Sequence, residues 1–369
     1  MKVVVLGGAG DMGSETVRDL IQYTDVSKVT IADRNREAAE KLAQSLGDER
    51  IAVETVDAAC HDDLVRVLSG HDVAAGALGP FYRFERLIAE AVLDAGINYV
   101  SICDDHDAAE AVLKLDPVAR EKGVKILTGL GWTPGLSNIL ARQGYEELDQ
   151  ADSIRIYWAG SAGDSEGLAV ILHLIHIFTG KVTTFQNGVH MEIKAGSDME
   201  SVEFPAPLGK VHTYHLGHPE PVTLPRYLKG LREVTLKGGL AENYLNVISR
   251  LAASLRLTDS DKKKMLLGKA VKKTLPLLPV DKARSYSGIL VEITGTRAGE
   301  NVTIAYSAAD RMRRLTGIPL SIGAHFMARG AIERTGVFGP EADGSVNPAL
   351  FLQELERRGV KIEKKEQAL

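Results

Sequence analysis

The sequence has few cysteines, few aromatic residues and no long apolar run, and each shortage excludes a class of protein. Two cysteines, Cys60 and Cys103, in 369 residues are too few for a disulfide framework and have no zinc-site spacing. The longest apolar stretch, 168–178, is too short to cross a bilayer and contains two histidines. A strand pattern that starts at residue 2 leaves no room for a signal peptide, so we expect a cytoplasmic protein without a membrane segment.

Charge and length narrow the class further. The net charge is −5 and the pI is about 6.1. The basic run 262–264 lies beside apolar residues at helical spacing, so we interpret it as the solvated face of a helix. We therefore expect neither a nucleic-acid nor a membrane partner. With 369 residues, of which 44% are hydrophobic, the chain exceeds the usual size of a single core, which predicts two domains.

A strand-turn-helix pattern at the N-terminus predicts a dinucleotide-binding site. The first apolar run leads directly into a segment with four glycines, 7–13, and then into helical spacing. Gly8 permits a tight turn, Gly10 lets the backbone approach a pyrophosphate, and Gly13 lets the helix pack against the strand. Asp11 and Met12 lie at the helix N-terminus, which faces the phosphates. The alternative is a structural glycine turn that binds nothing.

The choice of dinucleotide depends on the end of the second apolar run. Asp33 follows the last glycine by about 20 residues, where a carboxylate binds the adenosine ribose hydroxyls. Arg34 and Arg36 are placed where a guanidinium could hold the 2′-phosphate of NADP. We expect NAD or NADP as cofactor, and we favour NAD because Asp33 would repel that phosphate.

The pattern of elements predicts an α/β protein. Residues 1–128 alternate strand and helix, which is typical of a doubly wound parallel sheet (Rossmann) domain. Residues 129–304 are expected to form a second α+β domain with a mixed or antiparallel sheet, for substrate binding and dimerisation, and 305–369 are expected to return to the first domain through a helix at 319–334. Strands of the first domain are expected at 2–6, 28–32, 51–55, 72–77, 98–102 and 124–128, with helices at 13–23, 35–46, 61–68, 83–95 and 107–122.

Loops that follow the parallel strands are expected to meet at one edge of the sheet. Gly79 and Pro80 are predicted to contact the cofactor and Tyr82 the substrate, although a tight turn that only shields the sheet is an alternative. Asp104 or His106 is the candidate catalytic base or ammonium-binding group, because oxidation of an amine requires its neutral form. The alternative is that Asp105 or Asp107 caps the next helix and that His106 is solvated.

Further candidate substrate contacts follow the sixth strand and continue into the second domain. Trp132 is a candidate pocket wall, and Gly135 and Ser137 would start a helix whose N–H groups hold a carboxylate; a domain-hinge turn is the alternative. His215 and Arg226 are candidates for binding the substrate in the second domain. We expect no metal at the triplet His212, His215 and His218, which lacks an obvious fourth ligand, and we interpret His173 and His176 as core residues.

Several segments carry a family resemblance, namely 8–13 with 32–34, 79–81, 129–138, 223–226 and 334–341. Together they resemble the saccharopine dehydrogenase-like oxidoreductases, and among them the lysine 6-dehydrogenase branch. The resemblance implies NAD(P)-dependent oxidation or reduction of an amino acid at a carbon that bears nitrogen, in a two-domain subunit that forms a homodimer through its second domain. No Tyr-x-x-x-Lys occurs, which argues against the short-chain dehydrogenases. The alternative function is a non-catalytic dinucleotide sensor or scaffold of the same fold.

Overall fold

The structure is a computed structural model, and its described residues form two compact units. The first unit contains residues 1–136 and 313–358, and the second contains 137–312 and 359–369. The described residues are 1–164, 167–277, 279–281, 283 and 285–368.

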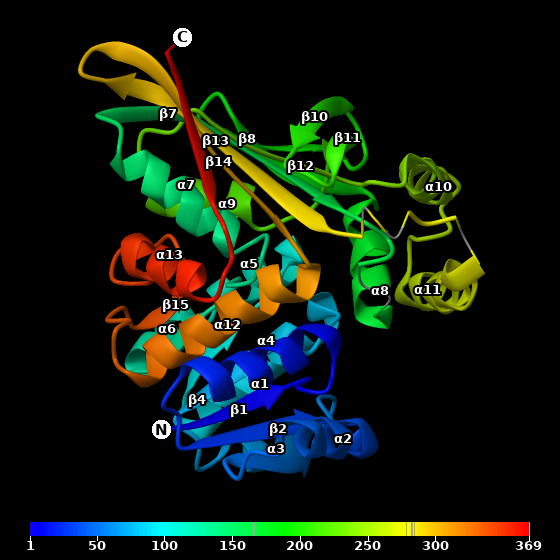
Figure 1. Cartoon of the computed structure of the whole chain (residues 1–369), viewed down its shortest axis with the longest axis vertical. Helices are drawn as coiled ribbons and strands as arrows, with labels where there is room; N and C mark the ends of the chain where they lie inside the picture. Colours follow the sequence, from blue (N-terminus) through cyan, green and yellow to red (C-terminus); the bar gives the residue numbers. More distant parts are fainter. Residues whose placement is uncertain (165–166, 278, 282, 284, 369) are drawn as a thin grey trace. The chain divides into compact units, whose positions relative to one another are not determined.

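The first unit is built on a seven-stranded sheet in which all neighbouring strands are parallel (Figure 1). The strand order is β15-β6-β5-β4-β1-β2-β3, so the direction of winding reverses beside β1. This reversal point is where open parallel sheets bind their ligands. The strands are β1 (Lys2–Leu6), β2 (Lys28–Asp33), β3 (Ile51–Thr55), β4 (Val73–Gly76), β5 (Asn98–Ser101), β6 (Lys125–Leu127) and β15 (Gly336–Phe338).

Burial explains why these short segments are strands. Val3, Val4 and Val5 of β1 have no exposed surface, and every residue of β4 is buried. Such runs are typical of parallel strands that are covered by helices on both faces. The helices of this unit are α1 (Asp11–Tyr23), α2 (Arg36–Leu46), α3 (His61–Leu68), α4 (Phe81–Ala95), α5 (His106–Leu113), α6 (Asp116–Glu121), α12 (Met312–Ala328) and α13 (Pro348–Arg357).

The second unit contains a nine-stranded mixed sheet. Its central pair, β7 and β12, is parallel, whereas β13, β14 and β16 join in antiparallel order. The strands are β7 (Gln150–Gly160), β8 (Lys181–Gln186), β9 (Val189–Lys194), β10 (Glu200–Phe204), β11 (Gly209–His215), β12 (Glu233–Leu240), β13 (Ser287–Arg297), β14 (Glu300–Asp310) and β16 (Glu363–Ala368). The helices are α7 (Leu136–Glu146), α8 (Leu168–Ile177), α9 (Glu220–Tyr227), α10 (Asn243–Ser254) and α11 (Asp261–Thr274), followed by the short 3-10 helix η1 (Leu275–Leu277).

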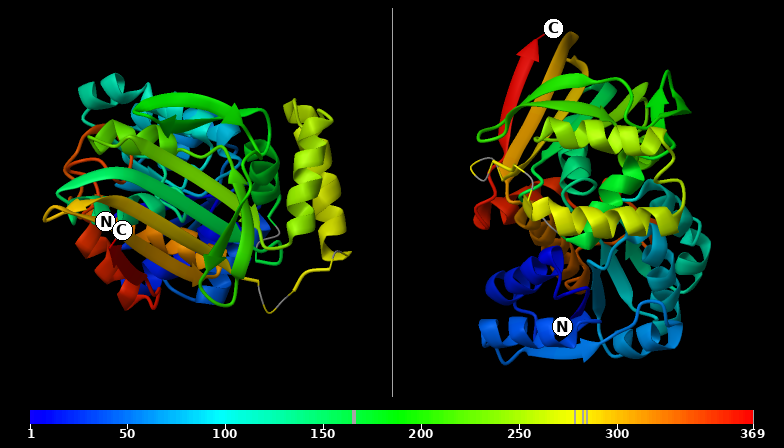
Figure 2. Two further views of the ribbon diagram at one scale, coloured as in Figure 1. Left: turned by 90° about the horizontal axis from the view of Figure 1, so that it is seen from above. Right: turned by 90° about the vertical axis from the view of Figure 1, so that its right-hand side faces the viewer.

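The bounds of the units differ from the expected 1–128 with 305–369 and 129–304. The second unit extends past residue 304 because β14 pairs with β13 along its full length, as far as Asp310. Residues 359–369 belong to the second unit because β16 pairs with β14. The two strands lie side by side in Figure 2. The sequence of β16 has no alternation of apolar and polar residues, so it does not predict a strand, and all of its residues are exposed.

Two helices of the first unit also differ from expectation. The helix expected at 107–122 is two helices, α5 and α6, and Pro117 lies in the first turn of α6. The helix expected at 319–334 begins at Met312 and contains Pro319 in its interior. Gly317 explains the close packing of this helix, because a Cβ atom there would lie 2.7 Å from the carbonyl oxygen of Met12 on α1.

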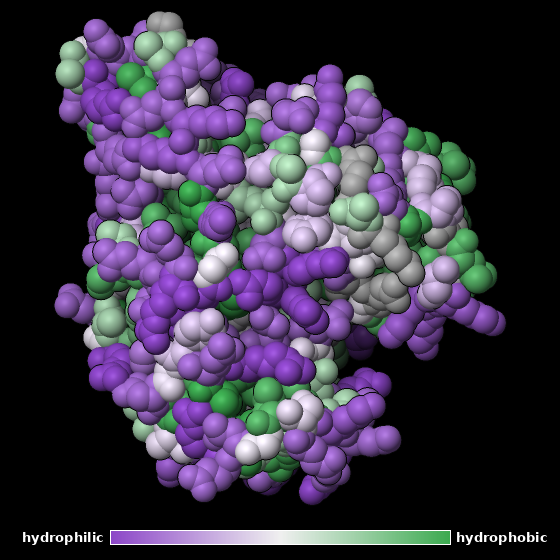
Figure 3. Space-filling view, in the orientation of Figure 1, coloured by the Kyte–Doolittle hydropathy of each residue, from purple (hydrophilic) through white to green (hydrophobic). Residues whose placement is uncertain are grey.

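The surface of the second unit carries apolar side chains over α10 and α11 (Figure 3). Ile248 and Leu251 of α10 are 54% and 56% exposed, and Leu266 of α11 is 74% exposed. These side chains therefore contribute little to the core of their own unit. Among the described residues, no helix is both long and apolar enough to span a membrane.

Candidate functional site

The glycine-rich turn between β1 and α1 is tightly packed at two glycines and more open at a third. A Cβ atom on Gly13 would lie 2.2 Å from the carbonyl oxygen of Gly7, and one on Gly8 would lie 2.9 Å from that of Val5. A Cβ atom on Gly10 would approach the carbonyl oxygen of Gly7 no closer than 3.3 Å. Gly8 and Gly13 therefore close the turn, whereas the backbone at Gly10 leaves room for an incoming group.

The N-terminus of α1 is suited to bind phosphate. Gly10 is its N-cap residue and has no side chain with which to cap the helix. N–H groups at such an end carry partial positive charge and bind anions. Asp11 and Met12 form the start of the first turn, so the predicted pyrophosphate contacts lie together. The turn and the helix therefore fit a dinucleotide.

Asp33 ends β2 and is held next to the glycine turn. Its Oδ2 accepts a hydrogen bond from the N–H of Ala9 at 3.1 Å, and its Oδ1 accepts one from the N–H of Asn35 at 2.9 Å. The side chain is half-buried. Each carboxylate oxygen has more than one acceptor site, so this orientation leaves capacity for ribose hydroxyls.

The two arginines that follow Asp33 differ in their surroundings. Arg36 forms an ion pair with Glu40 along α2, at 2.7 Å. Arg34 is exposed on the segment between β2 and α2. Of the two, Arg34 is therefore the better candidate for a contact with a 2′-phosphate.

The loops after β4 and β5 are joined by a buried carboxylate. Gly79 and Pro80 lead into α4, and the backbone N–H of Tyr82 donates to Oδ2 of Asp105 at 2.8 Å. Asp105 occupies the N-cap position of α5, but in the described structure its side chain makes no capping hydrogen bond. Its carboxylate thus ties the two loops together, which differs from the helix-capping alternative.

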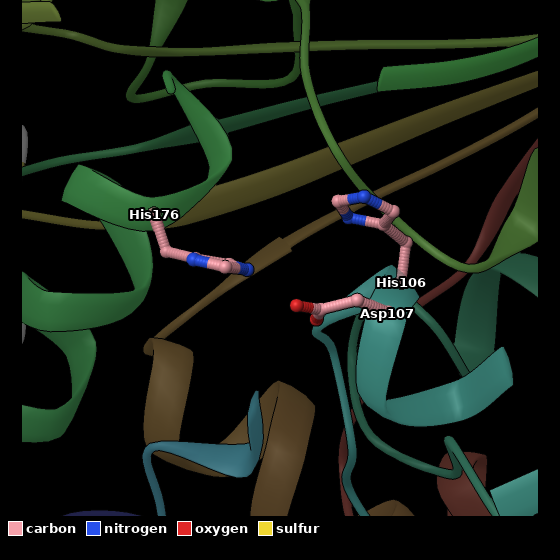
Figure 4. A group of neighbouring side chains, drawn as sticks. All are labelled: His106, Asp107 and His176. Atoms are coloured by element: carbon pink, nitrogen blue, oxygen red, sulfur yellow. The ribbon is translucent and has the colours of Figure 1, made fainter. Parts of the chain in front are cut away.

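The residues predicted to handle the proton lie at the carboxyl end of β5. Asp104 and His106 are both half-buried, and His106 is the first residue of α5. Figure 4 shows His106 and Asp107 on the first turn of α5, and it also labels His176 on α8. Asp107 is exposed, and its Oδ1 accepts the N–H of Ala108 at 2.9 Å. The roles of Asp104 and His106 stay predictions.

A buried glutamate behind these loops was missed in the sequence. Glu85 of α4 has no exposed surface. Its Oε1 accepts hydrogen bonds from Ser101 Oγ at 2.5 Å and from Thr128 Oγ1 at 3.4 Å, and its Oε2 accepts one from the hydroxyl of Tyr99 at 2.9 Å. Burial raises the pKa of Glu85 to about 7, against the opposing effect of these hydrogen bonds.

A sequence signal for this glutamate does exist. Glu85 shares helical spacing with Ile88, Ala89 and Val92, all of which are fully buried on the same helix. A charged residue on the apolar face of a helix is unusual and normally has polar partners. The partners could not be foreseen, because they come from β5 and from the residue after β6.

The segment after β6 forms a buried turn. The N–H of Gly131 donates to the carbonyl of Pro134, and the N–H of Leu136 donates to the carbonyl of Gly131, each at 2.9 Å. Gly135 has a φ of +124°, and a Cβ atom there would lie 2.2 Å from the nitrogen of Gly131. The backbone alone thus requires glycine at 135. Trp132 is 7% exposed.

In the second unit, the start of α7 is bonded to the start of α9. The hydroxyl of Ser137 donates to Oε1 of Glu220 at 2.7 Å, and Nδ2 of Asn138 donates to the hydroxyl of Thr223 at 3.4 Å. Glu220 is fully buried in the first turn of α9. Ser137 therefore positions α9, and its predicted contact with substrate stays untested.

A cluster of rings lies next to Glu220 in the same unit. The imidazole of His218 lies 5.8 Å from the ring of Trp158 and 5.2 Å from that of His173, between centroids, and its Nδ1 is 3.7 Å from Oε2 of Glu220. Gly238 makes room for the indole, because a Cβ atom there would lie 1.9 Å from Trp158. Glu220 and the contact between Trp158 and His218 were missed, since the strands and loops involved are far apart in sequence.

His215 and Arg226 lie in different surroundings. His215 is buried at the end of β11, with Nε2 3.3 Å from Oδ2 of Asp198, and burial lowers its pKa. Lys237 bridges Asp198 at 2.8 Å and Glu200 at 2.9 Å. Arg226, in the last turn of α9, is exposed. His215 thus lies beside the ion pairs of Lys237, whereas Arg226 is exposed to solvent.

The histidines considered for a metal site or for the core have other contacts. Within the described part of the second unit, neither His212, His215 nor His218 joins a group of three side chains at metal-binding distance. His176 Nδ1 lies 2.7 Å from Nζ of Lys264 on α11, which is typical of a structural histidine. His173 packs edge-on against His218.

Two known proteins are similar to this chain in sequence. The chain is 23% identical to the carboxyaminopropylagmatine dehydrogenase of Synechocystis sp., over 98% of this chain and 96% of that protein. It is 25% identical over 206 residues to the lipid droplet localized protein of Caenorhabditis elegans, which covers 52% of this chain and 48% of that protein.

The structure also resembles a solved enzyme. Apo saccharopine dehydrogenase (L-Glu forming) from Saccharomyces cerevisiae matches with a TM-score of 0.71 and 16% identity, over 100% of both chains. This match confirms the predicted fold, a parallel-sheet domain with a second domain built on a mixed sheet. Residues 3–127 match the model of the saccharopine dehydrogenase NADP binding domain.

Proposed function

We propose that the protein is an NAD(P)-dependent oxidoreductase that acts on the carbon–nitrogen bond of an amino acid. The observation that carries the proposal is the glycine turn with room at Gly10, beside the carboxylate of Asp33. A dinucleotide needs both features at the edge of the sheet, for its pyrophosphate and its adenosine ribose. The family match of residues 3–127 supports this interpretation.

Oxidation at a carbon that bears nitrogen determines what the protein side chains must do. The glycine turn and Asp33 would hold the dinucleotide, whose nicotinamide would supply the acceptor for a hydride from the substrate carbon. The substrate nitrogen must first be neutral, so an ammonium substrate gives one proton to a base. Loss of the hydride leaves an iminium, and addition of one water molecule then yields a carbonyl compound and a free amine. Asp104 and His106, at the carboxyl end of β5, are our candidates for the base.

Six further residues are proposed to orient the substrate. The exposed guanidinium of Arg226 is suited to bind a carboxylate, because it presents two parallel N–H groups. The largely buried Trp132 would form an apolar wall. Ser137 and His215 would act together with their bonded partners, Glu220 and Asp198. The full set is Tyr82, Trp132, Gly135, Ser137, His215 and Arg226.

The finer proposal is an activity of the lysine 6-dehydrogenase type. It is motivated by the sequence segments that resemble this branch. The relative from Synechocystis is named for carboxyaminopropylagmatine, which is also a nitrogen-rich compound. We therefore include lysine, saccharopine and carboxyaminopropylagmatine in one substrate panel.

The test combines cofactor binding with turnover. Calorimetry should detect binding of NAD or NADP, and the absorbance of reduced cofactor should change with at least one amine of the panel. Gly10→Ala should weaken binding at least about tenfold, since a Cβ atom would meet the pyrophosphate, with little change in thermal stability. Gly13→Ala is the comparison: it should lose stability as well, because its Cβ would lie 2.2 Å from Gly7.

Two results would contradict the proposal. If neither dinucleotide binds, the glycine turn is structural. If a dinucleotide binds but no amine or amino acid of a broad panel reacts, the protein is a sensor or scaffold of the same fold and not a dehydrogenase.

A further inference from the structure

Two carboxyl groups of the first unit are completely buried behind the carboxyl ends of its central strands. Glu85 and Asp105 both have 0% exposed surface. Glu85 is bonded to hydroxyl groups of β5 and of the residue after β6. Asp105 follows β5 and accepts the N–H of Tyr82 at the start of α4. Both groups therefore belong to the rigid edge of the sheet and not to its solvated surface.

Glu85 lies among hydroxyl groups, with a second carboxyl nearby. The side chains that act on it in the described structure are the hydroxyls of Tyr99, Ser101 and Thr128 and the carboxyl of Asp105. The neighbouring strand β4 contributes Gly76, where a Cβ atom would lie 2.2 Å from the hydroxyl of Tyr99.

The thiol of Cys103 belongs to the same cluster. Burial raises its pKa far above the usual range, and the carboxyls of Glu85, Asp105 and Asp104 raise it further. The thiol is thus uncharged, and loss of the proton from Glu85 adds a negative charge to this cluster.

The hydrogen bonds connect Glu85 to the loop that carries Asp104 and His106. Ser101 Oγ donates to Glu85 and accepts the N–H of Cys103 at 3.4 Å. A protonated Glu85 would instead donate to one of its hydroxyl partners, which changes the direction of that bond. A change in the protonation state of Glu85 thus alters the hydrogen bonds of the backbone after β5.

The position of a bound dinucleotide relative to this edge follows from the strand order. Asp33, on β2, is the ribose contact, and the glycine turn of β1 is the pyrophosphate contact. The chain of the cofactor runs across the reversal point beside β1, so its other half extends toward β4 and β5. That half ends in the nicotinamide ring, which carries a positive charge when oxidised and none when reduced.

We propose that the buried carboxyls Glu85 and Asp105 make the site selective for the oxidised, cationic nicotinamide, and that Glu85 makes this selectivity depend on pH. The inference rests on the dinucleotide binding proposed above. Glu85 acts through its charge and through the loop that it positions. Its pKa of about 7 makes it largely neutral in mildly acidic solution and ionised in mildly basic solution. The oxidised cofactor should therefore gain affinity, relative to the reduced one, as the pH rises.

The test is the ratio of two dissociation constants, that of the reduced cofactor divided by that of the oxidised one. Both forms carry the same phosphates, so their titration cancels in the ratio. In the native protein the ratio should rise about fivefold between about pH 5.5 and about pH 8.5, as expected for one added charge at roughly 10 Å in a partly polarisable site. In Glu85→Gln, which keeps the size of the side chain, the ratio should lose the part of this rise that comes from Glu85 and change with pH much less than in the native protein.

The matched control lies on the same helix. Glu90 forms a surface ion pair with Arg86 at 2.8 Å, so Glu90→Gln should keep the native pH dependence. Asp105→Asn provides a second variant, because its amide oxygen can still accept the N–H of Tyr82. It should lower the ratio at about pH 8.5, where a carboxyl is most readily ionised.

Proton release gives a readout that needs no variant. By linkage, a cation bound near Glu85 lowers the pKa of its carboxyl, so binding of the oxidised form near pH 7 should release a fraction of a proton. Calorimetry in two buffers with different ionisation enthalpies measures this fraction. A ratio that is independent of pH in the native protein, or that keeps its full pH dependence in Glu85→Gln, overturns this inference but leaves the proposed function standing. Failure of both cofactor forms to bind overturns the proposed function as well.

Discussion

Asp33 and the two arginines after it are the residues on which cofactor choice is expected to depend. In Asp33→Ala, affinity for NAD should fall about tenfold, since hydrogen bonds to a charged group contribute about 1.5–3 kcal/mol. Affinity for NADP should fall less, because the carboxylate no longer repels the 2′-phosphate. The measurement is the dissociation constant of each cofactor by calorimetry. An unchanged preference would remove Asp33 from this role.

Arg34 and Arg36 provide a matched pair for the same question. Arg34→Ala should weaken NADP and leave NAD unchanged, because Arg34 is exposed beside the ribose site. Arg36→Ala serves as the control, since Arg36 is paired with Glu40 at 2.7 Å. Equal effects of the two changes on NADP would show that only net charge matters.

Glu85 also predicts how stability depends on pH. Its pKa is raised from 4.5 to about 7 in the folded protein. Below pH 4.5 the group is protonated in both states and its contribution is fully present. Between the two values the unfolded chain loses the proton first, so stability falls by about 3 kcal/mol in total, and it changes no further above pH 7.

Denaturant unfolding at a series of pH values tests this expectation. Between pH 4.5 and pH 7 the native protein should lose about 3 kcal/mol more stability than Glu85→Gln. The exposed Glu121→Gln, in the same unit, should follow the native curve. Parallel curves for the native protein and Glu85→Gln would contradict the assigned pKa.

At the level of elements, α13 is held against α1 by a buried ion pair. Arg358, the C-cap residue of α13, donates through Nε to both carboxylate oxygens of Asp19, each at 2.9 Å. The two side chains are 1% and 3% exposed. Burial raises the pKa of Asp19, and Arg358 opposes that shift. Without Arg358, the buried carboxylate would lose its closest cation and keep Ser321 and Arg314 as partners.

Arg358→Met should therefore destabilise the first unit strongly. The expected loss is about 3–5 kcal/mol, because removal of one partner leaves a buried charge uncompensated. Arg357→Met is the control: Arg357 is exposed, pairs with Glu354 at 3.5 Å and should change stability by less than about 1 kcal/mol. Similar losses in the two variants would contradict the role of the buried pair.

The elements also show where sequence patterns succeed. The strands β1, β2 and β3 and the helices α1 to α4 lie within a few residues of their expected bounds, because their apolar periodicity is strong. Pro319 misled the expectation for α12, since proline usually marks the first turn of a helix. Here tertiary packing, including the close approach of Gly317 to α1, stabilises a helix with proline in its interior.

For the whole molecule, the oligomeric state is a prediction that comes from the family resemblance. We expect a homodimer that forms through the second unit. Light scattering after size exclusion should give a mass of about 80 kDa, twice the 39.8 kDa of one chain. A mass near that of one chain at micromolar concentration would contradict the expectation.

The sequence by itself determined the features that depend on neighbours along the chain. The turn at Gly8, Gly10 and Gly13 and the strand that precedes it are local, and so is the repeated strand-helix pattern that led to the α/β fold. Asp33 could be placed because a β-α-β unit has a nearly constant length. The site residues after β4, β5 and β6 were located by the same local logic, although their roles stay predictions.

Only the tertiary structure decided which side chains meet across long separations. Glu85 is bonded to Tyr99, Ser101 and Thr128, and Asp105 ties its loop to Tyr82. The strands β15 and β16, from the last part of the chain, join different sheets. These contacts require distant segments to fold together, and no local pattern encodes them, because hydrogen bonds and burial depend on what packs opposite each residue.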